Sequence, residues 1–136
     1  MKTRGWVYII VNKAMKGLIK IGYSNQDPIF RAMDLDNTGA PTKYQVAYDA
    51  LGDNPYEFEQ EMHKLLKERS VGKEWFKYQI NWAIGEIRES CPRIYAEKLD
   101  LDLIDEILAE NNTPWRNPNP SKKYDALPDK EKAGLS

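Results

Sequence analysis

The sequence predicts an α+β fold, a small three-stranded antiparallel sheet with helices packed on it, in the order β-β-α-β-α-α. Three observations support this prediction. Two runs rich in β-branched and aromatic residues stand on either side of a short Lys/Gly turn, which is the pattern of a β-hairpin. Strand-like and helix-like segments then follow one another along the chain. An opening hairpin followed by such segments is typical of an antiparallel sheet whose helices cover it.

The predicted hairpin lies near the start of the chain. Residues 6–12 read WVYIIVN, and the second strand, GLIKIGYS at 17–24, follows the turn KAMKG at 13–17. Both runs have the composition of strands. They also carry three side chains whose combination a hydrophobic core seldom needs: Tyr8, Lys20 and Tyr23. We therefore expect the hairpin to contribute to a functional site.

A short helix is expected after the hairpin. Asp27 stands at a capping position and is followed by proline, so residues 28–37, PIFRAMDLDN, have the start of a helix. Ile29 and Met33 fall on successive turns of this helix. Arg31 lies off that stripe, and we expect it to point outward.

A third strand and a second helix follow. YQVAYDAL at 44–51 alternates as a strand does, with Tyr44, Val46 and Tyr48 on one face. The helix begins at Pro55, and its buried stripe is formed by Phe58, Met62, Leu65 and Leu66.

The rest of the chain divides into four parts. Residues 69–78 are expected to be extended around a glycine, and 80–90 to form a third helix. Residues 93–110 predict an additional amphipathic helix with a stripe of Leu99, Leu103, Ile107 and Leu108. Residues 111–136 contain too few aliphatic side chains to offset their ordering entropy, so a polar, flexible tail is expected. The predicted organisation is a domain over 1–92, a helix over 93–110 and a tail over 111–136.

Composition limits the classes of site. The chain has 136 residues, 41% of them hydrophobic, which suits one compact domain. Cys91 and His63 are the only cysteine and histidine, so an intrachain disulfide and a Cys/His zinc site are excluded. A bound metal would need mainly oxygen ligands, which favours a hard cation such as Mg²⁺ or Mn²⁺. No apolar run reaches the length of a membrane span, and a cytoplasmic location is expected.

Charge is distributed unevenly along the chain. Residues 1–48 carry seven Lys/Arg against three Asp, whereas 49–136 carry thirteen Lys/Arg against eighteen Asp/Glu. A basic hairpin beside an acidic helix is consistent with a phosphate-binding surface next to a metal-binding carboxylate. An ordinary, unevenly charged surface is the alternative.

A set of motifs over residues 5–78 resembles the GIY-YIG nuclease superfamily, and in particular its small phage-type branch. GWVYI at 5–9 corresponds to the G-I-Y strand, with Tyr8 as its tyrosine, and KIGYS at 20–24 corresponds to Y-I-G. Arg31 matches the helical arginine. EFEQEMHKLL and GKEWF match the E-x-x-x-H and E-W-F signatures of that branch. Six elements in the right order form a far more specific pattern than any one of them.

This resemblance implies an enzyme, an endonuclease that hydrolyses DNA phosphodiester bonds with one divalent cation, Mg²⁺ or Mn²⁺, and a tyrosine-centred proton relay. Such a hydrolase must activate water, neutralise the phosphate and stabilise the departing alkoxide. The expected substrate is duplex or branched DNA, in a phage or mobile-element setting. The alternative from another class is a catalytically inactive nucleic-acid-binding or protein-binding module on the same fold.

The resemblance also implies roles for the hairpin and the first helix. Tyr8 is the expected general base or water-positioning group, and its pKa is expected to be lowered by the Lys20 ammonium. Tyr23 would orient the nucleophile or the phosphate, and Arg31 would hold phosphate oxygens in its planar fork. Structural alternatives are a sheet aromatic for each tyrosine, an edge-strand lysine for Lys20 and an exposed helix arginine for Arg31.

Two residues are candidates for the carboxylate that binds the metal. Glu59 is the first candidate by the resemblance, and Glu74 of the E-W-F motif is the rival. His63 stands four residues after Glu59, on the same helical face, and can be a second base, a phosphate donor, a metal neighbour or a packing residue. In the tail, Lys122, Lys123 and Trp115 can contact nucleic acid, and the segment can instead join a protein partner or a second copy of the chain.

Overall fold

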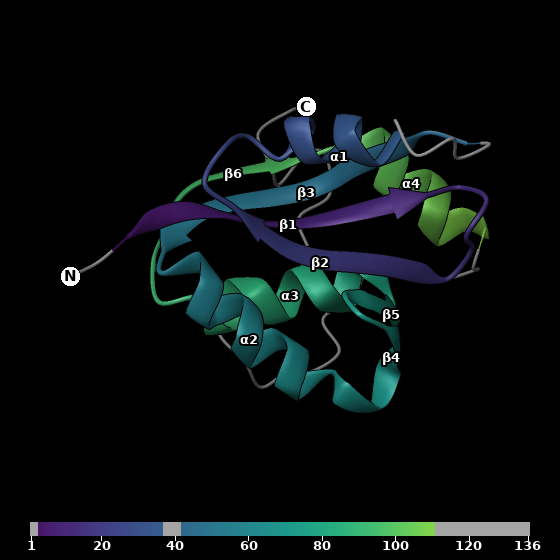
Figure 1. Ribbon diagram of the computed structural model, residues 1–136. Helices are drawn as coiled ribbons and strands as arrows, with labels where there is room; N and C mark the ends of the chain where they lie inside the picture. The colour runs from purple at the N-terminus through teal and green to yellow at the C-terminus, as the bar shows by residue number, and fades with distance from the viewer. Residues whose placement is uncertain (1–2, 37–41, 111–136) are drawn as a thin grey trace.

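The computed structural model describes residues 3–36 and 42–110, which form one six-stranded antiparallel sheet and four helices (Figure 1). The strands are β1 (Arg4–Asn12), β2 (Leu18–Ser24), β3 (Tyr44–Asp53), β4 (Ser70–Gly72), β5 (Trp75–Lys77) and β6 (Ile94–Leu99). The helices are α1 (Ile29–Asp36), α2 (Pro55–Leu65), α3 (Ile80–Ser90) and α4 (Leu101–Glu110), with a 3₁₀ turn at Lys67–Arg69. The strand order across the sheet is β4-β5-β2-β1-β3-β6.

The α+β class is confirmed, but the predicted sheet of three strands is too small. Two of the three additional strands, β4 and β5, lie in the segment over 69–78, which is expected to be extended but is not counted in the predicted sheet. The third comes from the predicted helix over 93–110, because its first part is strand β6 and only its second part is helix α4. Ile94–Leu99 pairs with the outer edge of β3, and Asp100 Oδ1 then caps α4 by accepting a hydrogen bond from Leu103 N at 3.1 Å. The predicted tail over 111–136 lies outside the described residues.

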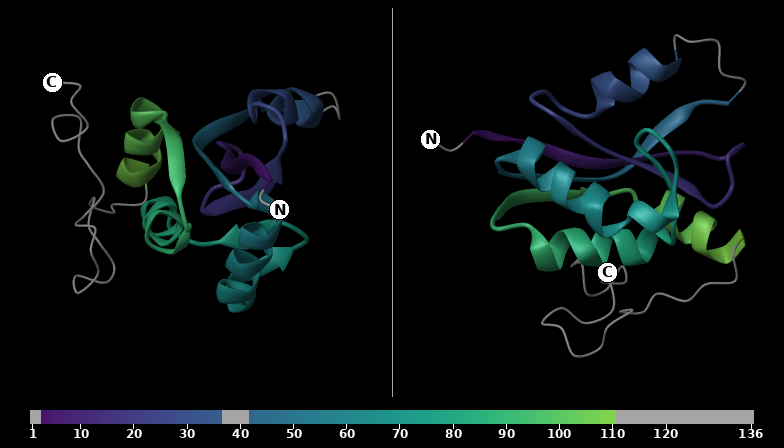
Figure 2. Two further views of the ribbon diagram at one scale, coloured as in Figure 1. Left: turned by 90° about the vertical axis from the view of Figure 1, so that its left-hand side faces the viewer. Right: turned by 60° about the horizontal axis from the view of Figure 1, so that its bottom comes forward.

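The two faces of the sheet carry cores of different size. The main core lies between the sheet and helices α2, α3 and α4, and includes Ile9, Ile21, Met62 and Ile84. The opposite face holds a smaller cluster of Tyr8, Ile10 and Ala32, and it is covered by α1 (Figures 1 and 2). Each fully buried aliphatic side chain contributes roughly 1.5 to 3 kcal/mol. Most of the apolar stabilisation therefore comes from the α2/α3/α4 side.

Helix α1 buries little of its own surface. Ala32 is its only buried residue, whereas Ile29, Phe30 and Met33 are about half exposed, at 47%, 52% and 54%. The sequence stripe of Ile29 and Met33 thus lies on the outside of the helix. An exposed apolar surface of this kind next to polar groups is a feature of binding surfaces.

A register shift divides β3 between the two faces. Ile9 pairs with Tyr48 and Ile10 pairs with Val46, so one residue of β3 is skipped in the ladder. Beyond this bulge the alternation reverses, which puts Tyr48 in the main core while Tyr44 and Val46 pack on the α1 side. The prediction that all three share a face is therefore wrong, because simple alternation assumes an unbroken ladder.

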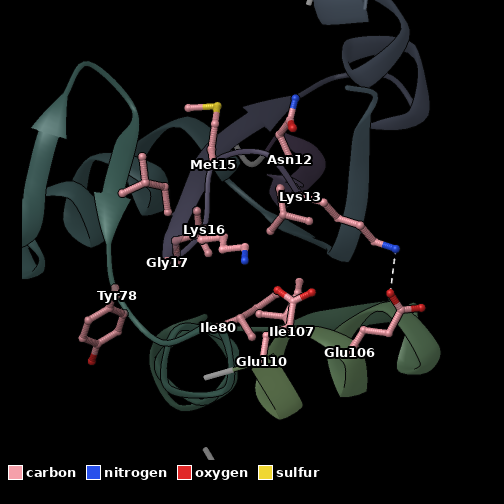
Figure 3. Close-up of a pocket in the computed structure, with 13 residues that line it drawn as sticks. Asn12, Lys13, Met15, Lys16, Gly17, Tyr78, Ile80, Glu106, Ile107 and Glu110 are labelled. Carbon is pink, nitrogen blue, oxygen red and sulfur yellow. Dashed lines mark hydrogen bonds and ion pairs between the residues drawn. The ribbon is translucent and has the colours of Figure 1, made fainter. Parts of the chain in front are cut away.

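Side chains at two places tie the outer elements to the sheet. Glu97 on β6 accepts hydrogen bonds from Tyr48 Oη at 2.6 Å and from both Arg88 Nε and Nη2, at 2.7 and 2.6 Å, which links β3, β6 and α3. At the other end, the turn between β1 and β2 contacts α4 through an ion pair of 2.6 Å between Lys13 and Glu106, beside a small cavity (Figure 3).

Among the described residues, no helix is long and apolar enough to cross a membrane.

One buried carboxylate makes stability depend on pH. Asp49 on β3 is 5% exposed, and burial raises its pKa from 3.8 to about 6. The folded state therefore holds this proton at pH values where the unfolded chain has lost it, so stability falls as pH rises from about 4 through about 6, by at most about 3 kcal/mol. We expect Asp49→Asn to match wild type near pH 4 and to be more stable near pH 7.5, in urea unfolding. Asp34→Asn, on the exposed side of α1, is the matched control. An equal difference at both pH values would contradict the assignment.

Candidate functional site

The candidate site is built on the hairpin, where Tyr8 lies across Gly22. The two residues are direct partners in the β1/β2 ladder, and the Tyr8 ring covers the place where a side chain of residue 22 would be. A Cβ on Gly22 would lie 2.5 Å from Tyr8 Cζ. The glycine of the KIG motif is therefore needed for the tyrosine ring to lie flat on the second strand. This packing fixes the ring, which is 2% exposed.

The sheet curls toward the face that carries Tyr8. The rings of Tyr44 on β3 and Trp75 on β5 have centroids 6.1 Å apart, although β1 and β2 lie between these strands in the sheet. In a flat sheet, strands three places apart would be roughly 14 Å from one another. Tyr8 therefore lies on a concave surface, under α1.

Arg31 on α1 reaches the Tyr8 phenol. Its side chain makes a hydrogen bond to the tyrosine and favours the ionised form, but burial and the negative charges of Glu74 and Glu59 outweigh it. The pKa of Tyr8 is raised to about 12. This is the reverse of the lowering expected from Lys20, because the Lys20 ammonium is engaged elsewhere and desolvation dominates. The expectation that Arg31 points outward is met in part. Arg31 is exposed, but its side chain makes a hydrogen bond to Tyr8.

Lys20 is paired with Glu74. Lys20 Nζ lies 2.9 Å from Glu74 Oε1 and 5.8 Å from the centre of the Trp75 ring, and the lysine side chain is buried. From the residues that the structure describes, this oxygen accepts no well-aligned hydrogen bond, so its contact with Lys20 is mainly Coulombic. The ladder explains the meeting, because Lys20 on β2 is the direct partner of Trp75, the residue after Glu74.

Helix α2 contacts β2 at Ile21, the residue that follows the part of β2 paired with β5. Ile21 N donates to Glu74 O at 3.0 Å, and Ile21 O accepts a hydrogen bond of 2.9 Å from His63 Nε2. The imidazole also packs edge-on against the Phe76 ring, at 5.0 Å between centroids. These contacts hold α2 in place, so His63 has a structural role at the strand edge.

The same helix brings Glu59 to the site. Glu59 is 2% exposed, and its Oε1 accepts a hydrogen bond from Gln60 Nε2 at 2.7 Å and lies 3.9 Å from His63 Nε2. Burial raises the pKa of Glu59, and the charge of Glu74 raises it further, while His63 lowers it. Two carboxylates therefore share this part of the structure, and both influence Tyr8.

Tyr23 lies apart from this group. It follows Gly22 in β2, so its side chain points to the opposite face of the strand. Its ring is 39% exposed and packs edge-on against Tyr56 of α2, with centroids 5.3 Å apart. The structure thus brings Tyr8, Lys20, Arg31 and Glu74 together on the α1 side of β2, with Glu59 and His63 of α2 at the edge of that strand. It turns Tyr23 to the α2 side, away from the Tyr8 ring.

The donor set suits a hard cation that is held by few protein ligands. Glu59 is a buried carboxylate whose only ion-pair partner among the described residues is His63, at 3.9 Å, whereas Glu74 Oε1 already lies 2.9 Å from Lys20 Nζ. Among the described residues, no group of three or more His, Cys, Asp or Glu side chains is placed to hold a metal. One or two carboxylates, completed by water and substrate phosphate, is the arrangement that Mg²⁺ commonly adopts. Glu59 and Glu74 are the two carboxylates at the site that would take part in such an arrangement.

Two contributors to the site were not singled out from the sequence. Trp75 packs beside Lys20, and Gln60 donates to Glu59. Trp75 carried a usable signal, because it belongs to the E-W-F motif. Gln60 carried none, since a glutamine beside a glutamate is ordinary on a helix surface.

Comparison with known proteins identifies one family. A family model described as the T5orf172 domain matches residues 5–91, from β1 to the end of α3, which is well over half of the chain. Curated proteins and solved structures gave no match. All six residues of the site fall within the matched segment. The chain therefore belongs to the T5orf172 domain family.

Proposed function

We propose that this protein is a metal-dependent endonuclease of the GIY-YIG type that hydrolyses phosphodiester bonds of DNA. The observation that carries the proposal is that Tyr8, Arg31 and Lys20, on the concave face, lie close enough to Glu59 and Glu74 for the two carboxylates to raise the pKa of Tyr8. These groups come from five separate elements or loops, and a packing role alone does not require them to converge. Their sequence motifs resemble those of the superfamily in the same order.

Arg31 is the expected phosphate-binding group. Its guanidinium keeps its charge and is exposed at the mouth of the site, where it already bonds the Tyr8 phenol. A planar fork of donors matches two phosphate oxygens. Lys20 is buried against Glu74 and Trp75, so its role is to position the carboxylate and to add positive potential beneath the phosphate.

Tyr8 is the expected proton-relay group. With a pKa of about 12 the phenol is protonated at neutral pH, so it is not a preformed base. Its oxygen can accept a hydrogen bond from the attacking water while its own proton is directed to a neighbouring oxygen. Arg31 stabilises negative charge that develops on the phenolic oxygen during this transfer.

Glu59 is the better candidate than Glu74 for holding the cation. Glu74 already has an ammonium partner at 2.9 Å, whereas the more deeply buried Glu59 has none at that distance. A divalent ion bound there would polarise the phosphate and help to stabilise the leaving alkoxide. The Glu59 carboxylate would hold that ion, and the Lys20/Glu74 pair would set the charge around it.

A nucleic-acid-binding module without catalysis is the second candidate. It is favoured by the Lys20/Glu74 ion pair, which already neutralises one carboxylate, and by the raised pKa of Tyr8. Both features would allow the site to bind a phosphate without cleaving it.

A cleavage assay separates the two candidates. We expect the protein with millimolar Mg²⁺ or Mn²⁺ to convert supercoiled plasmid or branched DNA to cleaved products, and a chelator to abolish this. Glu59→Gln should raise the metal concentration needed for half-maximal cleavage by about tenfold or more, and Glu74→Gln should raise it less. Exposed Glu57→Gln, on another face of α2, is the control. If the protein bound DNA in a salt-sensitive way but cleaved it with neither metal, the binding-module proposal would replace the enzyme proposal.

A further inference from the structure

A second hollow lies on the α1 side of the sheet, next to Tyr8, because Asp49 in its lining is the direct partner of Tyr8 in the β1/β3 ladder. It is a groove of about 770 Å³ between α1, β3, β6 and the start of α4. Figure 2, in its left view, shows α1 and α4 on the two sides of β3. Its volume lies in the range of sites that bind ligands. Four aspartates and one lysine line the groove, so its charge is strongly negative.

Asp49 is the carboxylate in this groove that lacks a partner. It lines the groove, it is 5% exposed, and within the described residues no hydrogen bond or ion pair reaches it. Buried polar groups are nearly always hydrogen-bonded, and a buried charge is costly unless a counter-charge is near. Burial of the carboxylate also raises the pKa of Asp49. This effect outweighs the lowering by the Lys98 charge, and the negative charge of Asp27 raises the pKa further.

The neighbouring charged groups already have structural roles. Asp27 Oδ1 accepts a hydrogen bond from Ile29 N at 3.0 Å at the start of α1, and Asp100 caps α4. Lys98 lies 3.9 Å from Asp27 Oδ2, with its side chain 72% exposed. Lys98 is also the ladder partner of Asp49 and its charge lowers the pKa of that carboxyl, but among the described residues it makes no ion pair with Asp49.

The remaining lining of the groove is mostly apolar. It consists of Ile29, Val46, Leu99 and Leu101, together with Tyr44 and the polar Gln45. A ligand that suits this groove carries one cation for Asp49 and apolar groups on either side of that cation.

We infer that this groove binds a segment of a partner protein in which an arginine side chain enters between apolar neighbours and pairs with Asp49. The guanidinium is the most suitable cation, because its fork matches a carboxylate and it is less strongly hydrated than an ammonium. The apolar walls would receive the flanking side chains of the segment, as in other peptide-binding grooves. Four aspartates disfavour the phosphate backbone of DNA as the occupant. The inference does not depend on the nuclease proposal.

The probe is a pair of five-residue peptides, one with a central arginine flanked by leucines and the other with citrulline in place of the arginine. Citrulline has nearly the same shape but no charge. We expect the full chain to bind the arginine peptide at least about tenfold more tightly than the citrulline peptide, measured by NMR titration. The signals of Val46, Asp49 and Leu99 should move together, and the titration midpoint of the Asp49 carboxyl should fall on binding.

Matched variants test the role of Asp49. Asp49→Asn should abolish the preference for arginine, whereas Asp34→Asn, the same change on the exposed part of α1, should retain it. Three results would overturn the inference: equal binding of both peptides by wild type, agmatine alone binding as tightly as the arginine peptide, or duplex DNA displacing the peptide from the groove signals. The second would indicate a small amine as the ligand, and the third a nucleic acid.

Discussion

Tyr8→Phe is expected to reduce metal-dependent DNA cleavage by roughly 10² to 10⁴-fold, the range for loss of a group that transfers a proton in the transition state. The substitution keeps the ring that lies across Gly22, so the packing of the hairpin is preserved. It removes only the hydroxyl that bonds Arg31. Because Arg31 is exposed, water can replace that bond, and the loss of stability should stay within about 1 kcal/mol.

The measurement is single-turnover cleavage of a plasmid at saturating metal, with urea unfolding of the same samples. Tyr56→Phe is the matched control, because Tyr56 is an exposed tyrosine on α2 whose ring packs against Tyr23 and not against Tyr8. DNA binding without metal should change little in Tyr8→Phe, since Arg31 and Lys20 remain. Cleavage by Tyr8→Phe within threefold or so of wild type would remove Tyr8 from the mechanism.

The hairpin and most of the helices could be predicted from the sequence because their signals are local. β-branched runs, a Lys/Gly turn, capping aspartates and a proline at the start of a helix act within a few residues. β6 could not be predicted in the same way. IYAEKL joins an apolar periodicity that continues into α4, and it is a strand only because the outer edge of β3 is available for pairing. Such tertiary pairing overrides local propensity.

The site shows the same limit. The motifs indicated which residues belong together, and the structure does bring Tyr8, Arg31 and Glu59 into electrostatic contact. The direction of the Tyr8 pKa shift was mispredicted, because the sequence does not show that Glu74 holds Lys20 or that the phenol is buried. Tyr23 was grouped with the site because it is adjacent to the KIG motif, but strand alternation sends it to the other face. Asp49, which has no hydrogen bond or ion pair with the described residues, belongs to no motif and could only be found from its burial.

Gly22→Ala is expected to have the second large effect, a loss of about 2 to 4 kcal/mol of stability together with loss of the site geometry. The new Cβ would lie 2.5 Å from Cζ and 2.9 Å from Cε1 of Tyr8, closer than real Cβ contacts allow. Tyr8 is enclosed on its own face, so its ring can move only by leaving Arg31 or by separating β1 from β2. Gly17→Ala is the control, because a Cβ on Gly17 would have no atom within 4 Å, so the substitution is destabilising only through the φ of +77° at this position.

A double-mutant cycle shows whether the Tyr8 ring is the cause of this loss. Valine at position 8 keeps the strand propensity but is too short to lie across residue 22. In the Tyr8→Val background, Gly22→Ala should therefore cost less than about 1 kcal/mol, and it can even be stabilising, because alanine is less flexible than glycine in the unfolded chain. The coupling measured by urea unfolding should exceed about 1.5 kcal/mol. A Gly22→Ala penalty of the same size in both backgrounds would show that the glycine is needed by the backbone, and that the tyrosine is not what selects it.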